Sequence, residues 1–361
     1  MSLQSVTRLP DVRRAPRCSP LSMATWRRGA LLVVAMGALG LLRDHLIDRL
    51  PVVAGEIVRA QFDTDLVPRP VEYAVLLPGP DDRAEAADAA PAGAPADAGD
   101  SSELPLLLFL HGGGASREFL TQVQPLVEAA WRSGVLPPVV VATPSAGRSL
   151  YMDYRDGSQH WETLLAGPFL EHVAQSHGAS LDPARTLIAG VSMGGQGALR
   201  LAFKQPQRFA AVAAVEPAIM PALALEDVPR KNLFFQRPEL LETIYGQPID
   251  AEYWAANNPA TIAQQQIDRL RESKLAIYLE CGDEDVLRLH HGAEFLHRLL
   301  WDHQVPHEYH LVRGADHLGH SLRDRVAEAL AFLGRVLVPP PREPELERFR
   351  AAMRLLEMSE P

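Results

Sequence analysis

From Leu104 onward, short and almost wholly apolar runs alternate with segments whose apolar residues recur at helical spacing. The apolar runs cover residues 104–110, 137–143, 185–190, 209–215, 274–281 and 307–312. Strands that are apolar along their whole length, with helices between them, indicate a mostly parallel sheet covered by helices on both faces. The alternation therefore predicts one α/β domain over residues 55–338, with a further strand at 71–78.

Three other segments depart from this alternation. Residues 79–103 consist almost wholly of Ala, Asp, Gly, Pro and Glu, a composition that predicts a disordered surface loop inserted between two strands. Residues 218–272 form a longer connection than one crossover helix needs, and we expect them to cap the carboxyl edge of the sheet. A proline break followed by an amphipathic pattern predicts a helical appendage at 339–361.

The first 54 residues form an Arg- and Pro-rich leader with one short apolar segment. Arg27 and Arg28 precede an uncharged run over residues 29–42, which is shorter than the ~20 residues that span a bilayer but fits the hydrophobic part of a signal peptide. This pattern predicts export to the periplasm or exterior, or attachment to a membrane through the apolar segment. The alternative is a short apolar helix on a cytoplasmic protein.

Charge and cysteine content limit the partners and the covalent framework. The formal net charge of −10 argues against nucleic acid as a partner, because phosphate binding needs a basic face. The two cysteines, Cys18 and Cys281, lie in the leader and at the end of an apolar run, so no disulfide framework is expected.

The sequence "GVSMGG" at 190–195 lies where an apolar run expected to be a strand ends and a helical pattern begins. A glycine-rich turn of an α/β protein is one interpretation. The other is a sharp turn that exposes Ser192 as a nucleophile, which requires a strand before it and a helix after it. Because both neighbours are present here, the context favours Ser192 as a nucleophile.

A second glycine-rich turn, "LFLHGGGAS" at 108–116, ends another apolar strand. Attack on a carbonyl creates an oxyanion, which is stabilised by donors already directed at it. We expect the amides of Gly113 and Met193 to supply them, with Gly114 as the alternative to Gly113. A phosphate-binding loop would carry the Lys-Ser/Thr pair that is missing here. By analogy with the HGGG motif, we expect His111 to hold the loop.

A serine nucleophile needs a base, because its hydroxyl is not acidic enough to attack unaided. In this arrangement the order along the chain is Ser, then acid, then His. His317 follows the strand at 307–312 and is the expected base, with His320 and His310 as competitors. The pairs His307-x-x-His310 and His317-x-x-His320 lack the H-E-x-x-H arrangement, so no metal site is predicted.

The acid that orients the base has several candidates at this point. The segment "YLECGDEDVL" supplies an apolar strand, a glycine turn and three carboxylates, among them Asp283 and Asp285. Glu216, directly after the strand at 209–215, is a further candidate. Each of these carboxylates could equally be a solvated loop charge.

The motifs together resemble the putative-esterase family of α/β-hydrolases, which includes S-formylglutathione hydrolases, feruloyl esterases, enterochelin-type esterases and mycolyltransferases. The matching stretches run in family order over about 71–338: "LFLHGGG", "HWETLL", "DPARTLIAGVSMGGQGALRLAFKQPQRFAAV", "YWAANNP", "LECGDEDVL" and "GADHLGHSL". The resemblance implies an α/β-hydrolase fold with a cap insertion and a Ser–His–Asp triad on Ser192, His317 and Asp285. The chain lacks the tryptophan that closely follows the catalytic histidine in many relatives.

This resemblance implies a serine esterase that cleaves a small-molecule carboxylic ester through an acyl-enzyme and needs no cofactor. Trp161 is expected on the wall of the cleft, with core packing as the alternative role. An acyltransferase, a peptidase or a thioesterase could use the same triad. A catalytically silent hydrolase fold that acts as a binding module is the alternative from a different class.

Overall fold

The computed structural model describes residues 55–79, 103–233, 237–341 and 343–357. The chain divides into two compact units, 1–51 and 52–361, and the whole first unit lies outside the described residues. The predictions for the leader, with its apolar run at 29–42, and for residues 80–102 of the expected loop therefore also lie outside them. Within the described ranges, no helix has the length and apolarity needed to cross a membrane.

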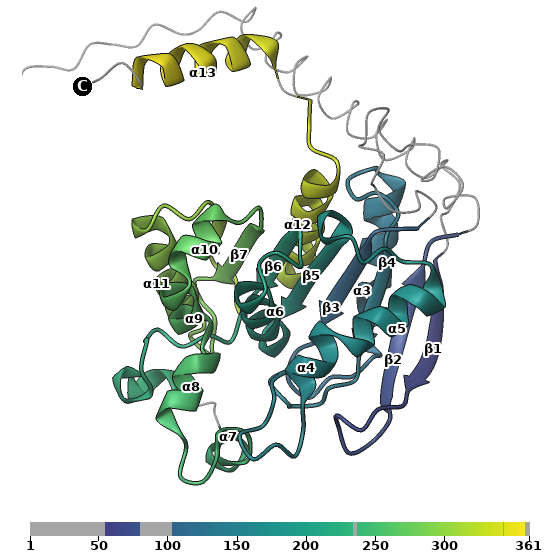
Figure 1. Ribbon diagram of the computed structural model, residues 1–361, viewed down its shortest axis with the longest axis vertical. Coiled ribbons are helices and arrows are strands. Elements are labelled where there is room, and N and C mark those ends of the chain that lie inside the picture. Colours follow the sequence, from purple (N-terminus) through teal and green to yellow (C-terminus); the bar gives the residue numbers. More distant parts are fainter. Residues whose placement is uncertain (1–54, 80–102, 234–236, 342, 358–361) are drawn as a thin grey trace, which may run out of the picture. The chain divides into compact units, whose positions relative to one another are not determined.

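The described strands form one eight-stranded sheet in the order β1-β2-β4-β3-β5-β6-β7-β8 (Figure 1). Strand β2 pairs antiparallel with both β1 and β4, and all other neighbours are parallel. The strands are β1 (Glu56–Phe62), β2 (Val71–Leu77), β3 (Leu106–Leu110), β4 (Val140–Pro144), β5 (Thr186–Val191), β6 (Ala211–Val215), β7 (Ala276–Gly282) and β8 (Glu308–Val312). The prediction of a mostly parallel sheet is confirmed.

Helices cover both faces of this sheet. On one face lie α3 (Phe119–Arg132) and α12 (Ser321–Leu337), and on the other lie α5 (Pro168–His177), α6 (Met193–Lys204) and α11 (His290–Asp302). The remaining helices include α4 (Trp161–Ala166) and α13 (Pro344–Glu357), the latter within the segment expected to form the appendage.

Strand β3 shows why the strands are apolar at every position. Its Leu106, Leu108 and Leu110 join the hydrophobic cluster under α5 and α6, whereas Leu107 and Phe109 join the cluster under α3 and α12. Since successive side chains of a strand point to opposite faces, a strand covered on both sides needs apolar residues throughout. Each such side chain contributes about 1.5–3 kcal/mol to the free energy of folding.

The long connection between β6 and β7 is helical. It contains α7 (Pro238–Tyr245), α8 (Ala251–Asn257), α9 (Pro259–Gln265) and α10 (Ile267–Glu272), preceded by the short 3₁₀ helices Leu225–Asp227 and Arg230–Asn232. Helix α9 packs against α6 and α11, which fixes this part of the connection to the domain.

Candidate active site

Ser192 is held in a sharp turn between β5 and α6. Its φ of 58° and ψ of −117° are a conformation that non-glycine residues rarely adopt. A Cβ atom on Gly190 would lie 2.2 Å from the carbonyl carbon of Gly194, and one on Gly194 would lie 2.1 Å from the Leu110 oxygen. The glycines of "GVSMGG" are therefore required by the space that the turn leaves.

Helix α6 begins directly after Ser192, so that the first amide groups of the helix lie next to the serine. These groups have no partner within a helix, and they carry the positive end of the helix dipole. Ser192 itself is half-buried, and its own amide donates to the Val215 oxygen at 2.9 Å. The Met193 amide, at the first helical position, is thus available to a developing negative charge.

The glycine turn after β3 offers a second donor. The Gly114 amide donates to the Gly147 oxygen at 3.2 Å, so this group is already occupied. The Gly113 amide has no backbone partner within the described ranges, and both Gly112 and Gly113 line the same cavity as Ser192. The geometry thus favours Gly113 over Gly114 as the donor.

His111 holds this turn in place. The ring is fully buried; its Nδ1 donates to the Gly112 oxygen at 2.7 Å, and its Nε2 accepts from the Ala146 amide at 3.0 Å. Burial lowers the pKa of His111, which keeps the ring neutral and suited to donate on one side and accept on the other. Both ring nitrogens are therefore used to fix the loop.

The imidazole of His317 pairs with Asp285. Nδ1 of His317 lies 3.0 Å from Oδ2 of Asp285, and the other oxygen of Asp285 accepts from the Leu287 amide at 2.5 Å. Burial alone would raise the pKa of Asp285, but hydrogen bonds to His317 and to Glu216 outweigh it and hold the pKa below its ordinary value. Asp285 is therefore an ionised partner for the ring.

The other candidates for acid and base lie elsewhere. Asp283 accepts from the Gly314 amide at 2.7 Å, which commits it to the loop backbone. His310 lies on β8, with its Nε2 3.6 Å from Glu308, and His320 is an exposed residue at the start of α12. Neither histidine lines the cavity that contains Ser192.

The loops that carry Asp285 and His317 are joined to each other. A Cβ atom on Gly282 would lie 2.1 Å from the Ala315 oxygen, so the two loop backbones are in direct contact. Hydrogen bonds join them further: Glu284 N to Ala315 O at 3.0 Å, Val286 N to Asp316 Oδ1 at 2.8 Å, and Gly314 N to Asp283 Oδ1 at 2.7 Å. Asp285 and His317 are thus held on one continuous piece of structure.

Glu216 lies next to this pair without replacing Asp285. Its carboxyl is fully buried, with Oε2 3.9 Å from Nδ1 of His317, and it accepts from the Cys281 thiol at 2.7 Å and the Gly282 amide at 3.0 Å. Burial, together with the hydrogen bond to Asp285, raises the pKa of Glu216 to about 7. With its pKa raised in this way, Glu216 can carry a proton close to the carboxylate of Asp285.

Arg325, on α12, supplies the positive charge for this buried group. Its guanidinium contacts Glu216, lies 3.1 Å from Oε1 of Glu280, and donates to the Asp316 oxygen at 2.7 Å. Burial raises the pKa of Glu280 to about 7. Ligand-type atoms of Glu216, Cys281 and Asp285 lie within 4.8 Å of one another, but Arg325 and His317 already occupy the positions beside their carboxylates.

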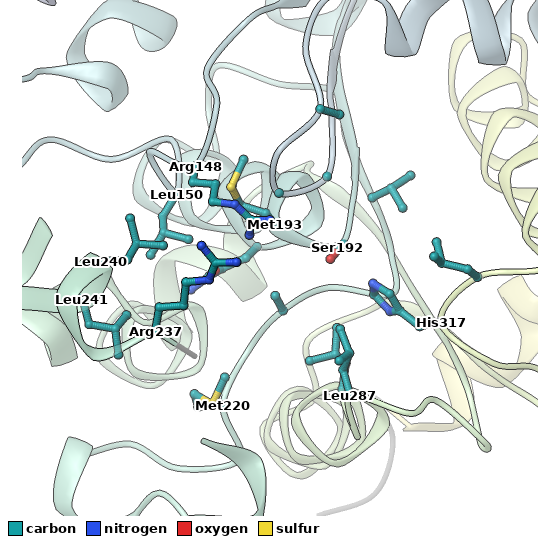
Figure 2. Close-up of a pocket in the computed structure, with 18 of the residues that line it drawn as sticks. Arg148, Leu150, Ser192, Met193, Met220, Arg237, Leu240, Leu241, Leu287 and His317 are labelled. Carbon is teal, nitrogen blue, oxygen red and sulfur yellow. The ribbon is translucent and has the colours of Figure 1, made fainter. Parts of the chain in front are cut away.

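A cavity of about 540 Å³, here called the Ser192 cavity, brings the site together. Its lining includes Ser192, His317, Gly113 and Met193, and Figure 2 shows the serine and the imidazole on its wall. Within the described residues, no hydrogen bond joins these two side chains. The size suits a small-molecule ligand.

The rest of the lining is mostly apolar and comes in part from the connection between β6 and β7. The apolar residues include Leu150, Met220, Leu240, Leu241, Tyr245, Trp254, Leu287, Leu289 and Leu318. Two arginines, Arg148 and Arg237, also line it. Sequence reasoning did not single out these arginines, although Arg148 lies in the loop after β4, where functional residues of parallel sheets gather.

Trp161 does not line the Ser192 cavity. It is a buried residue at the start of α4, packed in the hydrophobic core, and its Nε1 donates to Oε1 of Gln159 at 2.8 Å. It also borders a different hollow, lined by Arg69 and Glu72 among others. The expectation that Trp161 walls the cleft does not agree with this placement, and the tryptophan of the cavity is Trp254.

The model of the "Putative esterase" family matches residues 94–325, which is more than half of the chain. The chain belongs to this family. An acetyl esterase of Caldicellulosiruptor saccharolyticus is 29% identical over 122 residues, a stretch that makes up 34% of this chain and 44% of that protein. The chain thus spans less than half the length of this curated relative.

Solved structures of esterases share the fold of this family member. A ferulic acid esterase has a TM-score of 0.60 at 20% identity, covering 79% of this chain and 99% of that one. An S-formylglutathione hydrolase of Staphylococcus aureus has a TM-score of 0.58 at 17% identity, covering 78% and 99%. The fold is that of an α/β-hydrolase.

Proposed function

We propose that this protein hydrolyses a carboxylic ester through an acyl-enzyme formed on Ser192. The observation that carries the proposal is the 3.0 Å contact between His317 and the buried Asp285, because this imidazole lines the same cavity as a serine on a strained turn. Membership of the esterase family supports the same reaction.

In the first half of the reaction, Oγ of Ser192 attacks the ester carbonyl while Nε2 of His317 takes the hydroxyl proton. Asp285 accepts a hydrogen bond from Nδ1, which fixes the tautomer and stabilises the imidazolium. The amides of Gly113 and Met193 accommodate the oxyanion of the tetrahedral intermediate. Each of these donors is expected to contribute about 3–4 kcal/mol to the stabilisation of the transition state.

The intermediate then collapses, and the bond to the alcohol oxygen breaks. The imidazolium gives its proton to the departing alcohol, which leaves the acyl group bound to Ser192. A water molecule then attacks the acyl carbonyl while His317 removes a proton from this water. The carboxylic acid product leaves, and the hydroxyl of Ser192 is restored. The side chains named here account for every proton, so no cofactor takes part in the proposed steps.

A fluorophosphonate probe tests the proposal, because it reacts covalently with an activated serine. We expect the native chain to be labelled and to hydrolyse 4-nitrophenyl acetate, and Ser192→Ala to lose labelling and about 10⁴-fold or more of its kcat. The control is Ser133→Ala, whose hydroxyl bonds the Ala130 oxygen at the end of α3. Labelling that persists in folded Ser192→Ala overturns the proposal. Absence of labelling in the folded native chain favours a silent binding module instead.

A further inference from the structure

The charged groups on the wall of the Ser192 cavity are unevenly distributed. Apart from the imidazole of His317, they are the guanidinium groups of Arg148 and Arg237, and the lining contains no Asp or Glu among the described residues. This occurs in a chain with a formal net charge of −10. A cavity lined by one sign of charge with apolar walls attracts ligands of the opposite sign.

Arg148 is built into the site, since its guanidinium packs on the glycine turn that supplies the Gly113 amide. A methyl group added at Gly113 would lie 3.3 Å from Nη1 of Arg148, and one at Gly114 would lie 3.0 Å from Nη2. Gly114 also has a φ of +85°, which side chains rarely adopt. The turn thus leaves room for this guanidinium beside Gly113 and Gly114.

Arg237 lies directly before the first residue of α7 and lines the same cavity. Its neighbours Leu240 and Leu241 line the cavity too, so the guanidinium adjoins an apolar wall. Neither Arg237 nor Arg148 forms a side-chain hydrogen bond or ion pair with any residue in the described ranges, and both are exposed. Their donors are free for a ligand.

An unpaired guanidinium offers several N–H donors in a planar fork that matches a carboxylate or another oxyanion. Two such groups beside an apolar cavity suit a substrate with an apolar body and a negative end. We propose that the ester substrate carries an oxyanion, such as a carboxylate, which Arg148 and Arg237 bind. This inference rests on the proposed function, because it assigns a substrate class to the same site.

The position of the arginines also indicates which half of the ester carries the charge. His317 must lie next to the departing alcohol, since it returns the proton to that oxygen. In the view of Figure 2, both guanidinium groups are drawn on the side of Ser192 away from His317. We therefore assign the negative group to the acyl half of the substrate.

Matched pairs of esters test this assignment in the full chain. The acyl arm uses the mono-4-nitrophenyl esters of adipate, pimelate and suberate, which keep one free carboxylate. Each is compared with the neutral diester in which that carboxylate is a methyl ester and the 4-nitrophenyl ester is unchanged. The alcohol arm compares 4-acetoxybenzoate with its methyl ester. We expect kcat/KM to favour the anionic acyl esters by about tenfold at low ionic strength, and added salt to reduce this preference.

The variants Arg148→Gln and Arg237→Gln should each reduce the preference about threefold, mainly through KM, and the double variant should abolish it. The readout is the ratio of kcat/KM for the anionic ester to kcat/KM for its neutral partner in the same variant, because Arg148 also packs on the glycine turn and its loss lowers both values together. Arg230→Gln is the matched control, because Arg230 is an exposed arginine in the same connection that does not line the cavity.

The outcomes separate this inference from the proposed function. Neutral diesters that are hydrolysed by the native chain but not by Ser192→Ala support the esterase, whatever the arginines do. Equal kcat/KM values for neutral and anionic esters in the native chain overturn the anion inference alone. The same holds if Arg148→Gln and Arg237→Gln lower kcat/KM equally for both kinds of ester. A preference confined to the alcohol arm overturns the assignment to the acyl half.

Discussion

Two carboxyl groups flank the imidazole of His317, and they differ in distance and in protonation. Asp285 lies 3.0 Å from Nδ1 and Glu216 lies 3.9 Å from it. Because burial and the hydrogen bond to Asp285 raise the pKa of Glu216 to about 7, Glu216 is protonated in mildly acidic solution, whereas Asp285 is ionised there. A second full negative charge beside the ring is thereby avoided.

The different roles of neighbouring carboxylates lead to a prediction for Asp285→Asn. We expect kcat to fall about 10⁴-fold, because an amide at this position no longer holds the imidazole in the reactive tautomer. The matched control is Asp283→Asn, whose Oδ1 can still accept from the Gly314 amide. Steady-state kinetics with 4-nitrophenyl acetate measures both. A larger loss in Asp283→Asn than in Asp285→Asn would contradict the assignment of the acid.

Sequence patterns located some site residues better than others. Ser192 and Gly113 lie in turns that each contain a glycine required by the backbone, Gly194 in the first and Gly114 in the second, so the sequence itself records the constraint. The place of Glu216 depends on the pairing of β6 with β7, which no local pattern contains. For Trp161 the sequence left both a cleft wall and the core open, because an apolar ring suits the two equally well and only packing decides between them.

At the scale of elements, the junction of β5 and α6 leaves no room for side chains. A Cβ on Gly194 would lie 2.1 Å from the backbone oxygen of Leu110, so Gly194→Ala must push apart α6 and the end of β3. We expect the free energy of unfolding to drop by about 3 kcal/mol or more, measured by urea denaturation, and kcat to fall in any folded fraction.

Gly112→Ala is the control for this prediction. A Cβ there would meet its nearest neighbour, the Val191 oxygen, at 3.6 Å, which is an ordinary contact. Its cost should remain below about 1 kcal/mol. If both alanine variants are equally stable, the junction of β5 and α6 is not as tightly packed as the structure indicates.

The strands differed in how visible they were in the sequence. Every apolar run predicted as a strand overlaps one, because strands buried on both faces must be apolar throughout. Strand β1 was not predicted. It lies at the edge of the sheet, its residues are half-buried or exposed, and "EIVRAQF" therefore lacks a strong apolar pattern.

For the molecule as a whole, the buried carboxyls make stability depend on pH. The pKa values of Glu216 and Glu280 rise from 4.5 to about 7 in the folded chain, each chiefly through burial. Between these values the folded state binds more protons than the unfolded state, so the free energy of unfolding should fall as pH rises from 5 to about 7. The drop is of the order of 3 kcal/mol for each group taken alone. The combined drop should be smaller than the two added together, because both carboxyls contact Arg325.

Urea denaturation at several pH values between 5 and 8 measures this effect. Glu280→Gln should flatten the curve, because its amide stays neutral throughout, and should stabilise the protein at pH 8 relative to the native chain. Asp285, with its lowered pKa, acts in the opposite direction and only in more acidic solution. A free energy of unfolding that rises between pH 5 and 7 would contradict the raised pKa values.

The bonded loops of Asp285 and His317 have a mechanical consequence. Because these loops share backbone contacts and hydrogen bonds, we expect Asp285 and His317 to move together, and Ser192 to move with the β5–α6 junction. In the proposed mechanism, the distance between Oγ of Ser192 and the ring of His317 is then the contact that we expect to vary most. We expect substitutions far from the site to change this distance more readily than the 3.0 Å contact between His317 and Asp285.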